Sequence, residues 1–246
     1  MLIKIWSLTD AGLVRKENQD AYGLRQQLPS GHTVCVVCDG MGGPAGGQLA
    51  SRIAVNTYLA ELEKVLHADM SPEQVREAAS YCVALANRAV WEAAGSSEEY
   101  ANMGTTLVSA VIGDEMAVLV NVGDSRAYHL GETGIRRITR DHSWVESMVE
   151  CGKITPEEAR RHPNRNLITR ALGPENSVEC DGYLCPLQAG ESLLLCTDGL
   201  VNTVTDEEML HEVRQDDKDT CMERLLAIAK SRGARDNVTA VLLNLA

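Results

Sequence analysis

Four aspartates stand where runs of apolar residues begin or end. The runs "CVVCDG" and "LLLCTDG" both close with Asp-Gly, at Asp39 and Asp198, and a third run, "VLVNVGDS", reaches Asp124. Asp236 comes just before the final apolar run, in "ARDNVTAVLL". If these strand ends converge, their carboxylates can share one place only when they are protonated or bound to cations.

Carboxylate oxygens, backbone carbonyls and water are the ligands that Mg²⁺ and Mn²⁺ prefer. The glycines that follow two of the aspartates, Gly40 and Gly199, allow a sharp turn and free a carbonyl oxygen. Two ions held together would clamp a phosphoryl group and activate water. They would also offset the repulsion between phosphate and a chain of net charge −12. Asp-Gly and Gly-Asp-Ser are also common turn sequences, so the spacing alone leaves a metal site and simple turns both open.

The stretch "CVVCDGMGGPAGG" permits two other interpretations, and both are weak. Cys35 and Cys38 have the spacing of a redox pair or half a zinc site, but they lie in a predicted strand that points them to opposite faces. No second C-x-x-C completes a zinc site, so buried thiols are the simpler interpretation. The glycines do not form a phosphate-binding P-loop either, because Gln48 follows them and the next lysine is Lys64.

The apolar periodicity predicts strands in hairpin blocks, with helices between the blocks. Helices are expected at 48–66, at 72–94 after a capping box opened by Ser71, at 206–214 and at 220–230. Strands are expected at 2–8, 20–28, 33–39, 105–113, 115–124, 125–131, 134–139, 177–185, 191–198 and 237–245, with a hairpin turn at Gly113 and Asp114. This order indicates an α+β fold with antiparallel sheets. No linker divides residues 1–246, so one domain is expected, with a polar surface insertion near 141–173.

Composition excludes several classes of protein. The acidic balance and the lack of a dense Lys/Arg run argue against nucleic acid as a partner. The longest apolar runs are too short to cross a bilayer, and the N-terminus has no signal-peptide pattern. We therefore expect a cytoplasmic protein that does not associate with a membrane.

Taken together and in order, seven segments of the chain resemble the metal-dependent serine/threonine protein phosphatases (PPM, or type 2C) in their compact bacterial form. These segments are "TDAGLVRKENQDAYG", "VVCDGMGG", "MGTTLVSAVI", "NVGDSRAYHL", "ITRDHSWVESMVECGKITPEEARRHPNRNLITRALG", "LLLCTDGL" and "ARDNVTAVLL". They cover essentially the whole chain. The resemblance implies a four-layer α-β-β-α sandwich, in which helices flank two antiparallel sheets.

The resemblance also implies the metal ligands. Asp39 would bridge two ions, with the Gly40 carbonyl as a further ligand, and Asp198 and Asp236 would complete the shell of the first ion. Asp20 would act through metal-bound water. A third, weaker ion would use Asp124 together with Asp198.

Arg15 would receive the substrate phosphate, a role that suits its bidentate guanidinium. Without the resemblance, an arginine this close to the N-terminus would be interpreted as a solvated side chain.

Three positions depart from the family pattern. Gln19 replaces a glutamate that many members carry, which removes one acid near the metals. Met41 and Pro44 stand where eukaryotic and bacterial members, respectively, have a histidine. The leaving-group proton must then come from elsewhere, and turnover of alkyl phosphoserine and phosphothreonine is expected to be slower than with such a histidine. Pro44 also suits the start of a helix near Ala45, while His142 is expected to be structural, at the start of the flap segment 141–173 that would shape substrate choice.

The implied function is hydrolysis of phosphoserine and phosphothreonine on proteins by a metal-activated water, with Mn²⁺ or Mg²⁺. A Hanks-type Ser/Thr kinase would phosphorylate the same substrates, and a monomer is expected. Two alternatives stay open. One is a catalytically silent module that binds phosphoproteins. The other is an enzyme for another phosphoester, such as a phosphorylated anti-sigma-factor antagonist.

Overall fold

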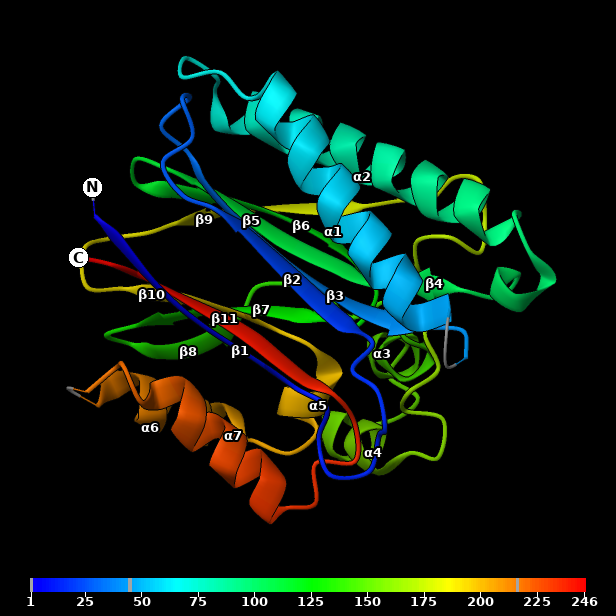
Figure 1. Cartoon of the computed structure of the whole chain (residues 1–246). Helices are drawn as coiled ribbons and strands as arrows, with labels where there is room; N and C mark the ends of the chain where they lie inside the picture. Colours follow the sequence, from blue (N-terminus) through cyan, green and yellow to red (C-terminus); the bar gives the residue numbers. More distant parts are fainter. Residues whose placement is uncertain (1, 44–45, 216) are drawn as a thin grey trace.

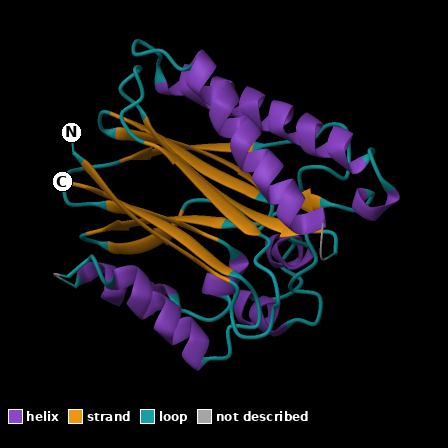
Figure 2. Ribbon diagram, viewed as in Figure 1, coloured by secondary structure: helices purple, strands orange, loops and turns teal. Residues whose placement is uncertain are grey.

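The computed structural model, which describes residues 2–43, 46–215 and 217–246, is a sandwich of two antiparallel sheets with helices on both outer faces (Figures 1 and 2). The first sheet has the strand order β1-β11-β10-β7-β8. Its strands are β1 (Ile3–Asp10), β11 (Val238–Leu245), β10 (Ser192–Cys196), β7 (Arg126–Gly131) and β8 (Gly134–Arg137). Every pairing in this sheet is antiparallel. Because β1 pairs with β11, the first and last strands of the chain lie side by side.

The second sheet has the order β2-β3-β5-β6-β9, and a short strand, β4, also pairs with β3. Its strands are β2 (Asp20–Arg25), β3 (Thr33–Met41), β4 (Gly104–Thr105), β5 (Leu107–Gly113), β6 (Met116–Val122) and β9 (Asp181–Pro186). The predicted hairpin joins β5 to β6, and Asp114 in its turn has a positive φ of 37°. The predicted strand at 177–185 is too long at its start, because residues 177–180 form a loop.

Two long helices, α1 (Gly46–Val65) and α2 (Pro72–Ala94), cover the outer face of the second sheet. The predicted capping box opens α2, because the Ser71 side chain accepts from the Gln74 backbone and the Gln74 side chain accepts from the Ser71 backbone. Helices α6 (Asp206–Arg214) and α7 (Cys221–Ser231) cover the first sheet, at positions within one residue of the prediction. The predicted helix start at Pro44 and Ala45 lies outside the described residues.

Three apolar cores hold the four layers together. One lies between α1, α2 and the second sheet, one lies between the sheets, and one lies between the first sheet, α6 and α7. Alternation along β3 sends Cys35 into the core between the sheets and Cys38 into the core under the helices, as expected for a strand. The predicted α-β-β-α architecture is therefore confirmed.

The polar insertion lies at the end of the sandwich opposite the chain termini, beside the one-turn helix α5 (Asp198–Val201) (Figure 1). It contains α3 (Trp144–Glu150) and α4 (Pro156–Arg161), while a 3₁₀ turn, Glu98–Tyr100, follows α2. An isolated bridge between Ser143 and Ile168 closes the insertion on itself, and one between Thr105 of β4 and Leu172 ties it back to the sheet. In the described part of the chain, no helix is both long and apolar enough to cross a bilayer.

Candidate metal and phosphate site

One cleft of about 640 Å³ opens at the end of the sandwich where the strands carry their aspartates. Its lining includes six of the seven residues predicted for the site, namely Arg15, Asp39, Gly40, Asp124, Asp198 and Asp236. The seventh, Asp20, is buried and lies directly opposite Asp39 in the pairing of β2 with β3. The fold thus brings together residues that lie up to 221 positions apart in the chain, as Arg15 and Asp236 do.

Two threonines fix the backbone at Asp39. The Asp39 N–H donates to Thr106 Oγ1, and the Asp39 carbonyl accepts from the Thr105 hydroxyl and the Thr106 N–H, each at 2.9 Å. At this point β3 changes partner from β5 to β4. These threonines were not singled out in the sequence, although they open the apolar run that became β5.

Gly40 does not make the sharp turn predicted for it. It lies inside β3, opposite Thr105, and its φ is not in the left-handed region, so the chain makes no sharp turn there. An added Cβ at Gly40 would lie 2.0 Å from the Gly47 carbonyl oxygen, so the residue is glycine because α1 packs against it closely. Gly199 is likewise tightly packed, because an added Cβ would lie 1.9 Å from the carbonyl oxygen of Asn237, just before β11. The turn itself is made by Gly42 and Gly43, which both have positive φ.

Asp198 begins α5 instead of ending the preceding strand, and one turn of helix orients its carboxylate. Asp198 Oδ2 accepts from Asn202 Nδ2 at 3.0 Å, whereas Oδ1 is buried and finds no hydrogen-bond partner among the described residues. Asp20 has the same asymmetry, because its Oδ2 accepts from the Thr197 hydroxyl at 2.9 Å and its buried Oδ1 has no partner in the described part of the chain. Each carboxylate is therefore held by one oxygen and offers the other.

Asn237 positions the N-terminal loop that carries Arg15. Its Oδ1 accepts from the Gln19 N–H at 2.8 Å, and its Nδ2 donates to the carbonyls of Ala11 and Glu17 at 3.0 and 2.9 Å. The Arg15 guanidinium, whose side chain is 55% exposed, donates to Asp236 Oδ2 at 2.9 Å. Asn237 was not predicted from the sequence. The available signal was its position directly after Asp236, a predicted metal ligand.

The flap segment joins the cleft through Arg126, Asp141 and His142. Arg126 makes a two-pronged ion pair with the buried Asp141, with Nε at 2.9 Å and Nη2 at 2.6 Å from carboxylate oxygens. The Gly123 N–H, one residue before Asp124, donates to His142 Nδ1 at 3.1 Å, so the His142 proton lies on Nε2, which faces Asp181 at 3.3 Å. His142 is thus a buried link between the Asp124 turn and the flap, in agreement with the structural role expected for it.

Electrostatics in the cleft favour protonated or cation-bound carboxylates. Burial, reinforced by neighbouring carboxylates, raises the pKa of Asp20 to about 7 and that of Asp198 to about 6. The same causes raise the pKa of Asp39 and of Asp124 well above the usual range. Hydrogen bonding to Asp236 raises the pKa of the Arg15 guanidinium, so Arg15 stays charged.

These groups have the chemistry that a hard divalent cation needs. Two buried carboxylate oxygens lack partners, four carboxyl groups resist ionisation, and all are oxygen ligands. Within the described residues, no three acidic, histidine or cysteine side chains form a preassembled ligand cluster. The residues therefore fit Mn²⁺ or Mg²⁺ by the chemistry of their oxygen ligands.

The departures from the family pattern also have structural counterparts. Gln19 turns its amide to the glycine turn, with Nε2 donating to the Gly43 carbonyl at 2.8 Å. An ionised glutamate could not make this bond, because its carboxylate has no hydrogen to donate and the Gly43 carbonyl oxygen only accepts. Met41 lines the cleft, and the described lining contains no histidine. Pro44 lies outside the described residues.

Comparison with solved structures gives the class of protein. The serine/threonine phosphatase of S. agalactiae superposes with a TM-score of 0.91 and 30% identity, over 100% of both chains. A second neighbour is the catalytic domain of the serine threonine protein phosphatase PstP in complex with two manganese ions. It superposes with a TM-score of 0.85 and 31% identity, over 98% of this chain and 97% of its own. By fold and cleft the chain is a protein phosphatase.

Sequence comparison gives the family. The protein phosphatase 2C model matches residues 14–242. The serine/threonine phosphatase stp of Listeria monocytogenes is 36% identical over 238 residues, which are 96% of this chain and 93% of the relative. The chain therefore belongs to the protein phosphatase 2C family, and the resemblance noted in its motifs is confirmed.

Proposed function

We propose that this phosphatase hydrolyses phosphoserine and phosphothreonine monoesters on proteins in the acidic cleft, with Mn²⁺ or Mg²⁺. The observation that carries the proposal is the convergence of buried carboxylates with unpartnered oxygens beneath an exposed arginine. Relatives named serine/threonine phosphatase supply the substrate class, and the two manganese ions in PstP support the choice of metal.

Each carboxylate has an assigned part in holding the ions. Asp39 would bridge two ions, with the Gly40 carbonyl beside it, and Asp198 and Asp236 would complete the first shell. Asp20, which lies opposite Asp39 and outside the cleft lining, would act through water, and Asp124 with Asp198 would hold a third, weaker ion. Bound there, the cations lower the pKa of water and neutralise phosphoryl oxygens.

Arg15 would orient the phosphate. A guanidinium has five N–H donors, and within the described residues one of those on Arg15 donates to Asp236. The remaining donors face solvent at the mouth of the cleft and suit two phosphoryl oxygens. Because Asn237 holds the loop that carries Arg15, this cation is positioned before the substrate arrives.

Because the described lining offers no histidine, the leaving oxygen would take its proton from water. An aryl phosphate has an acidic leaving group that needs little protonation, whereas an alkyl phosphoserine needs more. We therefore expect p-nitrophenyl phosphate to depend less on a proton donor than phosphopeptides do, seen as a weaker solvent isotope effect.

The decisive experiment compares wild type with Asp39→Asn and with Asp114→Asn, the same change at an exposed turn between β5 and β6. We expect Mn²⁺-dependent hydrolysis of p-nitrophenyl phosphate and of a phosphothreonine peptide in wild type and Asp114→Asn. EDTA or Asp39→Asn should abolish it, and calorimetry should show weakened Mn²⁺ binding by Asp39→Asn. Peptide binding without metal-dependent turnover in wild type would instead support the silent module.

The remaining parts of the proposal come from the sequence, through its composition, its lack of a linker and its family resemblance. They are a single phosphatase domain over residues 1–246, a Hanks-type kinase that phosphorylates the same substrates, a monomeric state and a cytoplasmic location. Retention of Asp39, Asp198 and Asp236 argues against the silent module. The second alternative is an enzyme specific for a phosphorylated anti-sigma-factor antagonist. It would be favoured if the purified antagonist were hydrolysed far faster than phosphopeptides.

A further inference from the structure

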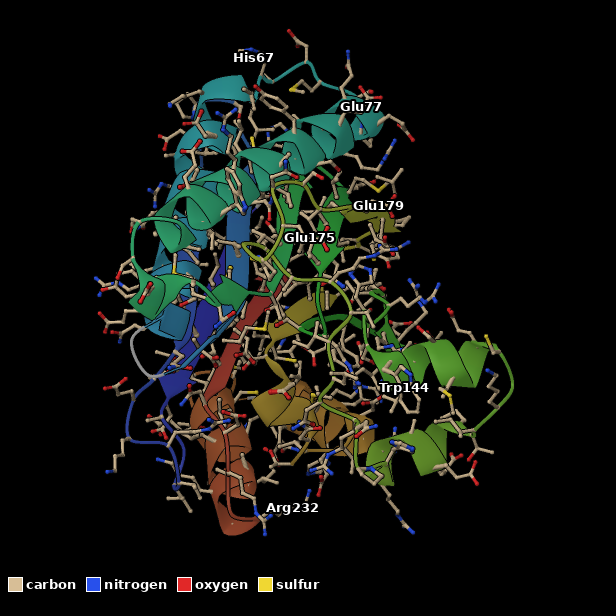
Figure 3. The ribbon with its side chains drawn as sticks, turned by 90° about the vertical axis from the view of Figure 1, so that its right-hand side faces the viewer. His67, Glu77, Trp144, Glu175, Glu179 and Arg232 are labelled. Atoms are coloured by element: carbon tan, nitrogen blue, oxygen red, sulfur yellow. The ribbon has the colours of Figure 1, made fainter. Side chains whose placement is uncertain are left out.

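A second groove, of about 560 Å³, opens beside the catalytic cleft and shares Met41 and Ile168 with it. We call it the flank groove. Figure 3 looks onto this end of the molecule, where the chain carrying Glu175 and Glu179 passes between α2 and the flap helix that carries Trp144. Because the two hollows share these lining residues, a substrate bound in the cleft would meet the flank groove where its chain passes Met41 and Ile168.

Hydrogen bonds from α2 and from Thr105 hold the backbone that forms the wall of the flank groove. Asn87 of α2 is fully buried, and its Nδ2 donates to the Glu175 carbonyl at 3.0 Å. Its Oδ1 accepts from the Gly173 N–H at 2.9 Å. The Leu172 N–H donates to the Thr105 carbonyl at 2.8 Å, and the Thr105 N–H donates to the Leu172 carbonyl at 3.0 Å. A groove whose backbone is already ordered loses little conformational entropy when it binds a ligand.

The groove combines an apolar floor with an acidic rim. Its apolar lining comes from Met41, Ile168, Ala171, Pro174 and Val178, and its rim carries the carboxylates of Glu175 and Glu179. The lining contains one cation, Arg170, which is already paired with Asp181 at 3.0 Å and with Glu179 at 3.4 Å.

Glu175, an exposed residue, has no side-chain partner within the described residues. The rim is therefore left with negative charge, which a cationic side chain would complement.

We infer that the flank groove binds the polypeptide beside the phosphorylated residue of the substrate, with an apolar side chain on the floor and a basic one at Glu175. The inference rests on the proposed function. The groove and the cleft share two lining residues, and three residues of extended chain span about 10 Å, so we expect residues within about three positions of the phosphoresidue to occupy the groove. The cleft itself recognises phosphate, and the flank groove adds the contacts that distinguish one phosphoprotein from another.

The test compares wild type with the double variant Glu175→Lys/Glu179→Lys, on phosphothreonine peptides. The peptides carry lysine or glutamate two and three residues from the phosphothreonine, on one side or the other. The matched control is Glu132→Lys/Glu223→Lys, at exposed sites remote from the groove. Both variants replace two glutamates with lysines, so both change the net charge from −12 to −8.

We expect wild type and the control to prefer the lysine peptides on one side, by on the order of tenfold in kcat/KM. The groove variant should lose or invert this preference, and added salt should weaken it in wild type. In a peptide that also carries a leucine next to the phosphothreonine, replacing that leucine by asparagine should lower the wild-type kcat/KM by about tenfold.

Hydrolysis of p-nitrophenyl phosphate, which has no flanking chain, should be equal in all three proteins. This measurement separates a failure of the proposed function from a failure of the inference about the flank groove. If wild type lacks Mn²⁺-dependent turnover of p-nitrophenyl phosphate, the proposed function is wrong. If that turnover is normal but the groove variant and wild type rank the peptides alike, the flank groove is not a substrate site.

Discussion

Metal-free protein should become less stable as the pH rises from about 5 to 8, and Asp20→Asn should remove part of that loss. The pKa of Asp20 is raised by burial from 3.8 to about 7 in the folded state. A carboxyl of this kind holds its proton more tightly when folded. Its contribution to stability is complete below the unfolded pKa and is lost as the pH rises through the folded one.

The magnitude follows from the size of the shift. A change from 3.8 to about 7 corresponds to about 4 kcal/mol between the two protonation states. Asp198, raised to about 6, adds a term of the same sign. Since a domain is stable by about 5–15 kcal/mol, the effect should be plain in equilibrium unfolding. It is an upper bound, because water entering the cleft would reduce it.

The assay is urea unfolding in EDTA at several pH values, for wild type and Asp20→Asn. Burial lowers the pKa of His32 and of His142, so these groups stabilise the fold as pH rises and oppose the carboxyl effect below about pH 6.5. The difference between the two proteins removes that contribution. We expect Asp20→Asn to gain stability over wild type by a few kcal/mol between about pH 5 and 8.

Added Mn²⁺ should reverse the trend in wild type, because cation binding favours the ionised carboxylates. Two results would refute the reasoning. One is a wild-type stability in EDTA that rises steadily from pH 6.5 to 8. The other is an Asp20→Asn curve parallel to that of wild type, which would show that Asp20 ionises as easily in the folded chain as in the unfolded one.

Three further predictions concern the scaffold of the site. Gly40→Ala should cost several kcal/mol and abolish turnover, because its Cβ would overlap a backbone carbonyl at 2.0 Å, whereas Gly95→Ala meets nothing closer than 3.6 Å and should be neutral in thermal unfolding. Asn237→Ala removes three hydrogen bonds and should cost about 2–3 kcal/mol in urea unfolding; unchanged stability and unchanged KM for phosphopeptide would contradict its assigned role. Arg126→Met leaves the buried Asp141 without its bidentate partner and should cost about 3–5 kcal/mol, while the double change with Asp141→Leu should recover much of it; a double variant less stable than the single one would show that the pair itself stabilises the fold.

Local sequence determined the secondary structure because its signals act within a few residues. Ser71 and Gln74 close a capping box without help from the rest of the chain. Alternation along 33–39 already separates the faces that carry Cys35 and Cys38, and the structure keeps that separation. The prediction failed where a local pattern had two outcomes, as at Asp198, which begins a helix instead of ending a strand.

The sequence also showed which carboxylates are candidates for a metal site, because the order of the motifs resembles a metal-dependent family where single Asp-Gly pairs would also suit simple turns. Only the tertiary structure decided that they meet. Asp20 faces Asp39 because β2 and β3 pair in one register, and Arg15 reaches Asp236 because β1 and β11 are neighbours. Burial and mutual repulsion, which raise the pKa values of these carboxyl groups, are properties of that assembly. Close packing against Gly40 and the three bonds of Asn237 likewise depend on segments far apart in the chain, and no pattern within one segment encodes such a contact.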